Sequence, residues 1–390
     1  MKNEVIKPFK IHISDEDITD LKRRLELTRF TDEIEDSGWD YGTNLNYLKQ
    51  LVHHWANEFD WRSEEKALNE FNQYTTNIDG FDLHFIHQKS NYENARTLVL
   101  LHGWPGSFME FTKIIGPLTD PERYGGLIED SFNVVVPSLP GFGFSERPSK
   151  KGYTPEYMAD VIALLMHRLG YEHYGLQGGD WGSTIGRYIA TNYSDHVTGL
   201  HLNFCDTMPS VDGKSVSLAT EDLTPLELKR LAASRSFASE GRAYFELLST
   251  KPQTVNYALN DSPAGLAAWM IEKFHSWSDC ENNIESRFSK DELLTNISIY
   301  WFTQTASSAS RIYYEQRHAE SKPRLNVSVP TARALFPAEI KTPQRDWVEA
   351  SYNLVRWTEM PSGGHFAALE EPELLIDDIR AFFRDLLNSK

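Results

Sequence analysis

One short stretch, Gly178-Gly179-Asp180-Trp181-Gly182, limits the possible folds of this chain more than any other. It follows residues 174–177, which suit a short buried strand, and it precedes residues 183–190, which have the pattern of a helix. A strand, a sharp turn of small residues and a helix predict an α/β protein in which the turn presents Asp180. The alternative is an ordinary tight connection whose acid favours the positive end of the helix dipole. These five residues alone leave both interpretations open.

The surrounding segments favour the first interpretation. Residues 97–101 and 133–137 are continuous apolar runs, as in strands that are buried on both faces of a parallel sheet. Residues 157–169 have a helical apolar period, and residues 198–204 form a further strand candidate after the Asp180 turn. Alternation of this kind predicts βαβ units and a mostly parallel central sheet flanked by helices.

The turn also suggests a chemistry. In the nucleophile elbow of α/β-hydrolases, G-x-S-x-G, a serine occupies the position that Asp180 holds here. A carboxylate attacks carbon without a base to deprotonate it, but the ester that results must then be hydrolysed. We therefore expect a histidine and an acid later in the chain, in the order acid, then histidine, that this fold uses. The histidine candidate is His365, which follows Pro361-Ser-Gly-Gly between the last strand candidate and the last helix.

Two acids compete for the place beside the histidine. Glu339 follows a strand candidate at 331–336 and precedes His365, whereas Asp206 follows the earlier strand candidate at 198–204. The chain order favours Glu339, and Asp206 remains the alternative. Asp346 and Glu349 are interpreted as charges on a helix surface.

The length of 390 residues exceeds that of a usual single domain, so insertions or additional domains are expected. Residues 1–95 form an N-terminal extension, rich in amphipathic helix and ending in a hairpin about Asp79-Gly80. Residues 96–206 and 323–390 are predicted to form the hydrolase core. Between them, residues 207–322 have helical patterns only, which predicts a helical lid inserted over the nucleophile.

The net charge of −17 argues against nucleic acid or an anionic membrane as a partner. No apolar run is long enough to span a bilayer and no secretion signal is visible, so we expect a cytoplasmic protein. No cofactor is expected. The spacing and directions of the cysteines and of the paired histidines do not suit a metal or redox site. These residues are Cys205, Cys280, His53, His54, His84 and His87.

Three motifs together resemble those of the microsomal-type epoxide hydrolases: residues 102–107 (His-Gly-Trp-Pro-Gly-Ser), residues 178–182 and residues 361–365. The similarity covers nearly the whole chain, because further segments resemble the meander and the lid of that family. These segments are residues 21–25, 39–42, 59–62, 78–80, 251–252, 258–263 and 272–274. The resemblance implies hydrolysis of an epoxide to a vicinal diol. Membrane-bound members carry an N-terminal anchor, whereas this chain starts at the meander, so we expect it to be soluble.

The resemblance also implies the roles of individual residues. Asp180 corresponds to the nucleophile, His365 to the base and Glu339, in Phe-Pro-Ala-Glu, to the acid that orients the base. Two lid tyrosines of the family hold the epoxide oxygen. They correspond to Tyr244, by its distance ahead of Lys251-Pro252, and to Tyr313, two residues before Glu315, with the adjacent Tyr314 as an open alternative. The backbone N–H groups of Trp104 and Trp181 are expected to form the oxyanion hole.

Two other functions compete with this interpretation. A haloalkane dehalogenase uses the same aspartate, histidine and acid, and the indole of Trp181 could bind the halide. A non-catalytic binding module with this fold should lack an intact set of nucleophile, base and acid, whereas all three residue types are present here. The abundance of aromatic residues suggests an apolar epoxide as the small-molecule substrate, and the sequence makes no prediction of an oligomeric state.

Overall fold

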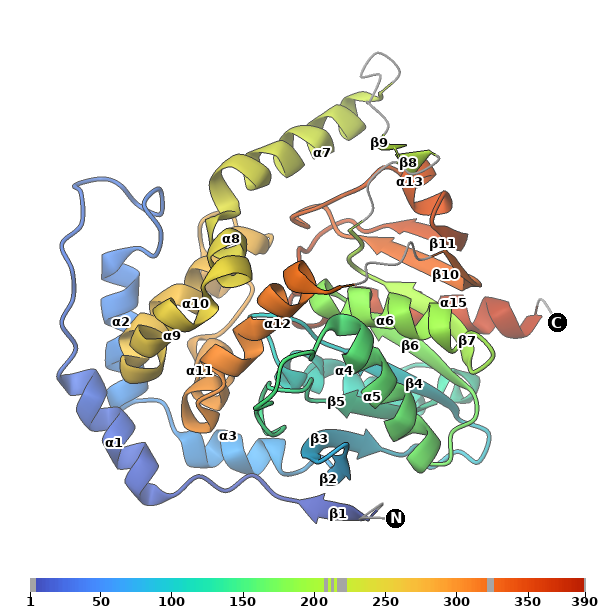
Figure 1. The fold of residues 1–390 in the computed structure, drawn as a ribbon, viewed down its shortest axis with the longest axis horizontal. Helices are drawn as coiled ribbons and strands as arrows, with labels where there is room; N and C mark the ends of the chain where they lie inside the picture. The colour runs from blue at the N-terminus through green and yellow to red at the C-terminus, as the bar shows by residue number, and fades with distance from the viewer. Residues whose placement is uncertain (1–4, 207–209, 212–213, 216–222, 321–325, 389–390) are drawn as a thin grey trace.

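The computed structural model describes residues 5–206, 210–211, 214–215, 223–320 and 326–388 (Figure 1). Within these residues the chain forms a nine-stranded sheet in the order β1-β2-β3-β5-β4-β6-β7-β10-β11. Its strands are β1 (Ile6–Phe9), β2 (Gln73–Ile78), β3 (Phe81–Gln88), β4 (Arg96–Leu101), β5 (Phe132–Pro137), β6 (Tyr174–Gly178), β7 (Val197–Leu202), β10 (Val327–Leu335) and β11 (Tyr352–Glu359). From β5 to β11 all neighbours pair in parallel, while β1, β2 and β3 add antiparallel pairs at one edge. The expected mostly parallel sheet is therefore confirmed.

Helices cover both faces of this sheet. α5 (Pro155–Arg168) packs beside α6 (Asp180–Asn192), and α4 (Thr112–Thr119) packs beside α15 (Pro372–Asn388). The central strands β4, β5 and β6 are almost wholly buried between these layers, which explains their continuous apolar sequences. The sheet thus forms a rigid support whose loops hold the predicted site residues.

The N-terminal extension contributes to the sheet as well as to helices. The hairpin expected about Asp79-Gly80 is present as β2 and β3, and both turn residues have positive φ angles of 50° and 93°. The strand β1 was not predicted from the sequence, because it is only four residues long, two of them exposed, and carries little apolar pattern. Three helices complete the extension: α1 (Asp15–Glu26), α2 (Leu45–Asn57) and α3 (Trp61–Leu68).

The segment between β7 and β10 is mainly helical, as expected (Figure 1). Its helices are α7 (Pro225–Ser236), α8 (Ala243–Thr250), α9 (Pro252–Asp261), α10 (Pro263–Trp277), α11 (Lys290–Thr303) and α12 (Ala306–His318). One difference is a short antiparallel hairpin of β8 (Ser210–Val211) and β9 (Lys214–Ser215), where only helices were expected. The remaining residues of 207–222 lie outside the described residues. No helix in the described ranges is long and apolar enough to cross a membrane.

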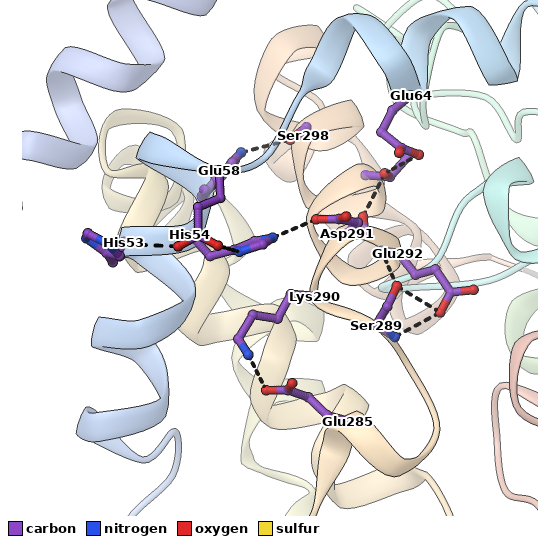
Figure 2. Close-up of polar contacts among 12 residues, drawn as sticks. His53, His54, Glu58, Glu64, Glu285, Ser289, Lys290, Asp291, Glu292 and Ser298 are labelled. Carbon is purple, nitrogen blue, oxygen red and sulfur yellow. Dashed lines mark hydrogen bonds and ion pairs between the residues drawn. The ribbon is translucent and has the colours of Figure 1, made fainter.

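The N-terminal extension is joined to the helical segment between β7 and β10 through α2 and α11 (Figure 2). His54 on α2 has one ring nitrogen 2.7 Å from Oδ1 of Asp291 on α11 and the other 3.1 Å from Oε2 of Glu58. Beside it, Nε1 of the buried Trp55 donates a hydrogen bond of 3.0 Å to Oγ of Ser298. Residues of α2 therefore help to fix the position of α11, although the two helices are far apart in the sequence.

Candidate active site

Asp180 occupies a sharp turn between β6 and α6. Its φ angle of 46° lies in the left-handed region, which is uncommon for a residue with a side chain. The turn can be this tight only with glycines at these positions, because neighbouring backbone atoms leave no space for a Cβ atom. A Cβ on Gly182 would lie 1.9 Å from the carbonyl oxygen of Leu101, and one on Gly178 would lie 2.6 Å from the carbonyl oxygen of Gly182.

The loops after β10 and β11 bring a glutamate and a histidine to this turn. Nε2 of His365 lies 3.3 Å from Oδ2 of Asp180, and Nδ1 of His365 lies 2.7 Å from Oε1 of Glu339. The side chains of His365 and Glu339 are buried, while that of Asp180 is 16% exposed. Burial alone would lower the pKa of His365. The negative charges of Glu339 and Asp180 outweigh burial and raise that pKa well above its ordinary value.

The alternative acid has a different partner. Oδ2 of Asp206 lies 2.7 Å from Nζ of Lys341, and both side chains are partly exposed. Glu349 pairs with Arg345 within the short helix α13 (Arg345–Glu349). The structure therefore brings Glu339, and not Asp206, to His365.

The loop after β4 contacts the carboxylate of Asp180 directly. The backbone N–H of Trp104 donates a hydrogen bond of 2.8 Å to Oδ1 of Asp180. A Cβ on Gly103 would lie 2.1 Å from the same oxygen, so the loop approaches this closely because residue 103 is a glycine. Trp181, at the start of α6, has its indole ring centre 4.9 Å from the ring centre of Tyr313.

Two tyrosines from the helical segment between β7 and β10 line a cavity that has Asp180 on its wall. Tyr244 comes from α8 and Tyr313 from α12, and their buried rings lie 5.8 Å apart at nearly a right angle. Among the side chains that the structure describes, the hydroxyl of Tyr313 is buried without a hydrogen-bond partner. Tyr314 instead stacks on His318, with ring centres 3.9 Å apart.

Burial raises the pKa of both cavity tyrosines well above its ordinary value, and the negative charge of Asp180 adds to this effect. Both hydroxyl groups of Tyr244 and Tyr313 therefore keep their protons at neutral pH and can donate hydrogen bonds. Aromatic and aliphatic side chains line much of the rest of this cavity, together with three charged side chains. The further side chains on its wall are Trp181, Thr184, Phe204, Asp206, Phe237, Arg242, Phe245, Ile340 and Lys341.

Other polar residues close to Asp180 were not predicted from the sequence. Glu110 and Asn203 line a second, smaller cavity together with Asp180 and His365. One local signal existed for Glu110, because it is the single charged residue in the apolar run 108–111 that directly follows the 102–107 motif. No group of three or more His, Cys, Asp and Glu side chains that could hold a metal ion occurs in the ranges that the structure covers.

Comparison with known families agrees with this architecture. Residues 6–111 match the family described as "Epoxide hydrolase N terminus", and residues 96–372 match the family described as "alpha/beta hydrolase fold". Epoxide hydrolase 1 from Sus scrofa is 43% identical over 406 residues, covering 98% of this chain and 89% of the relative. Juvenile hormone epoxide hydrolase 2 from Ctenocephalides felis is 40% identical over 395 residues, covering 96% of this chain and 84% of the relative.

Solved structures with the same architecture include two epoxide hydrolases. The Aspergillus niger epoxide hydrolase has a TM-score of 0.87 and 34% identity, covering 98% of this chain and 97% of the other. The juvenile hormone epoxide hydrolase of the silkworm Bombyx mori has a TM-score of 0.89 and 31% identity, covering 98% of this chain and 95% of the other. The chain therefore belongs to the microsomal-type epoxide hydrolases, in which an epoxide hydrolase N terminus precedes a hydrolase core of the α/β fold.

Proposed function

We propose that this chain hydrolyses an epoxide to a vicinal diol in two steps, through an ester on Asp180. One arrangement carries the proposal: the Asp180 carboxylate lies between the His365–Glu339 pair and the cavity of Tyr244 and Tyr313. A nucleophile, a base and two hydroxyl donors thus surround one space in which a strained ring could react.

In the first step, a carboxylate oxygen of Asp180 attacks one ring carbon and the bond between that carbon and the ring oxygen breaks. Negative charge moves from Asp180 to the ring oxygen. Tyr244 and Tyr313 donate hydrogen bonds to this oxygen. One of the two phenols transfers its proton to the oxygen, which forms the first hydroxyl group and leaves a phenolate. The raised pKa of both phenols supports this role, because the donor protons are present at neutral pH.

In the second step, water attacks the carbonyl carbon of the ester while His365 removes one of its protons. The N–H groups of Trp104 and Trp181 stabilise the oxyanion, at roughly 3 kcal/mol per donor. When this intermediate collapses, the bond between the former ester carbon and the diol oxygen breaks, and that oxygen takes the proton held by His365 to become the second hydroxyl group. The remaining proton of water leaves the Asp180 carboxyl group through solvent and restores the phenol, so the enzyme returns to its starting state. Ester formation removes the charge of Asp180, which is one cause of the raised pKa of His365, so the imidazole becomes available as a base when it is needed.

The apolar wall of the cavity supports an apolar epoxide as the substrate. Phe204, Phe237, Phe245 and Ile340 offer carbon surface near Asp180, whereas Arg242, Asp206 and Lys341 are the charged groups on this wall. We also propose a division of the chain into an N-terminal meander (1–95), a core (96–206 and 323–390) and a lid (207–322). The position of the helical segment between β7 and β10 supports this division.

A labelling experiment tests the two-step route. With enzyme in excess over an apolar epoxide in ¹⁸O-water, the diol of the first turnover should contain no solvent oxygen, because its new oxygen comes from Asp180. Label should appear in the diol only over later turnovers. Solvent oxygen in the first diol would show direct attack by water and contradict the proposal. Chloride release from a haloalkane, measured in parallel with diol formation, tests the dehalogenase alternative.

A further inference from the structure

A second cavity touches Asp180 but is separate from the cavity of the two tyrosines. The two cavities share Asp180, and no tyrosine lines the second one. The polar residues that line it include Asp180, His365, Glu110 and Asn203. The cavity has a volume of about 10 Å³, which is the lower limit for one water molecule and too small for an epoxide.

The hydrogen-bonding groups on this wall are not equally available. Oδ1 of Asn203 accepts a hydrogen bond of 2.7 Å from Nε2 of Gln177, and Nδ2 of Asn203 contacts the backbone oxygen of His365. The Asn203 amide is therefore occupied in holding the His365 loop. Glu110 faces the backbone N–H of Gly103, and its carboxyl group is close enough to Asp180 and His365 for their charges to affect its pKa.

A water molecule that attacks an ester carbon must be held in one orientation. It presents a lone pair to the carbon and gives one hydrogen to the base, which leaves its second hydrogen in need of an acceptor. A second hydrogen that pointed at an apolar wall would cost a hydrogen bond in a buried site. Among the side chains that line this cavity, Glu110 carries the carboxyl group, besides that of Asp180 itself, that can accept this hydrogen bond.

We propose that Glu110 accepts the second hydrogen of the attacking water and so orients it for hydrolysis of the Asp180 ester. This inference rests on the proposed function and adds a residue to its second step. The small cavity supplies the water, while the epoxide occupies the cavity of the tyrosines. The two reactants therefore approach Asp180 through different spaces.

The charge state of Glu110 fits this role. The pKa of Glu110 is raised to about 8, mainly by burial and in part by the charge of Asp180, although His365 and the Gly103 N–H act in the opposite direction. A carboxyl group that is mostly protonated at neutral pH still accepts a hydrogen bond through its carbonyl oxygen. It also avoids placing a second negative charge beside the oxyanion of the ester intermediate.

The experiment measures the two steps separately in the full-length enzyme by rapid mixing and acid quench. The ester on Asp180 is quantified by mass spectrometry and the diol by chromatography. Glu110→Met, of similar length but without an acceptor of this kind, should leave ester formation within about threefold of wild type. It should slow ester hydrolysis by about tenfold to a hundredfold, the effect of losing one hydrogen bond in the transition state. The ester should then accumulate during turnover.

Two comparisons separate this role from a structural one. Glu110→Gln keeps a neutral carbonyl acceptor and should hydrolyse the ester within about fivefold of wild type. Glu64→Met removes another partly buried glutamate, on α3, whose pKa burial also raises, and should change neither step. Glu110→Leu takes the place of Glu110→Met if the latter does not fold, with the same expectation.

Three results would overturn the proposal: unchanged ester hydrolysis in Glu110→Met, an equal loss in both steps, or a Glu110→Gln variant as slow as Glu110→Met. Failure of the proposed function would look different, because the wild-type enzyme would then form no ester on Asp180. The two failures are therefore distinguished by the wild-type measurement.

Discussion

Oε1 of Glu339 lies 2.7 Å from Nδ1 of His365, and both side chains are buried behind the nucleophile candidate. This contact determines which ring nitrogen faces Asp180, because Nδ1 is occupied and Nε2 is left for the reacting groups. The pair is thus oriented before any substrate arrives. The first two predictions follow from this geometry.

Replacing His365 should separate the two steps. His365→Gln keeps Asp180 as a nucleophile but removes the base, so the ester should form and persist. Hydrolysis should fall by at least about a thousandfold. Mass spectrometry of the intact protein should show a gain equal to the mass of the epoxide. Asp180→Asn should show no gain, and an unmodified His365→Gln enzyme would count against the ester.

Replacing Glu339 should change the pH dependence as well as the rate. The charge of Glu339 raises the pKa of His365, so Glu339→Gln should lower that pKa. Because His365 acts as a base only when neutral, the acidic limb of ester hydrolysis should move to lower pH. The maximal rate should fall by about 10²- to 10⁴-fold, because the ring loses its orientation. Single-turnover rates over a pH series measure both effects.

Asp206→Asn is the matched control for that experiment, because Asp206 pairs with Lys341 rather than with His365. It should leave the acidic limb where it is in the wild-type enzyme. If the acidic limb moved in Asp206→Asn but not in Glu339→Gln, Asp206 rather than Glu339 would be the acid that raises the pKa of His365.

The lid tyrosines should act in the first step only. Tyr244→Phe and Tyr313→Phe should each slow ester formation by about 100-fold, because each loses one donor to the ring oxygen. Hydrolysis of an ester that has already formed should stay close to the wild-type rate. Tyr314→Phe is the control, since Tyr314 stacks on His318, and it should behave like wild type in both steps.

A buried acid far from the reacting groups should contribute to stability. Asp378 on α15 accepts hydrogen bonds from Arg356 and Thr358 and lies 3.1 Å from Nε2 of His201. Burial alone would raise the pKa of Asp378, but these partners lower it from 3.8 to about 2. This difference corresponds to about 2 kcal/mol of folding free energy at neutral pH.

The sign of the pH effect follows from the lowered pKa. The contribution of Asp378 is complete above pH ~4, falls to about half near pH 3, and disappears as the pH passes below 2. Asp378→Asn should therefore lower the free energy of unfolding by ~2 kcal/mol or more at pH 7, and by less at pH 3. Urea titrations at both values measure this. Asp377→Asn changes an exposed neighbour on the same helix and should have no comparable effect.

Much of the site could be predicted because its residues follow strands. The turn at Asp180 has a local pattern of strand, glycines and helix, and His365 follows the last strand, where the order of elements places it beside the turn. Glu339 and Asp206 both follow strands, so only the positions of these strands in the sheet decide which of the two acids reaches His365. β7 and β10 are neighbours, and the loop after β10 reaches His365.

Other features depend on tertiary packing that no local pattern records. Tyr313 and Tyr314 are adjacent on α12, so they point in directions about 100° apart, and only the packing of the lid decides which one faces Asp180. Glu110 was missed because its neighbours Asp180 and His365 lie 70 and 255 residues away in the sequence. The strand β1 was missed because pairing with β2, rather than its own composition, stabilises it.

The contact between α2 and α11 has a consequence for how reactants reach Asp180. Trp55 is 1% exposed and hydrogen-bonded to Ser298, so swinging α11 away as a rigid flap would bring a large indole into water. Uncovering a side chain of this size costs about 3 kcal/mol. α11 is therefore fixed to α2, so we expect the epoxide to enter where the partly exposed Asp206–Lys341 ion pair lines the cavity of the two tyrosines.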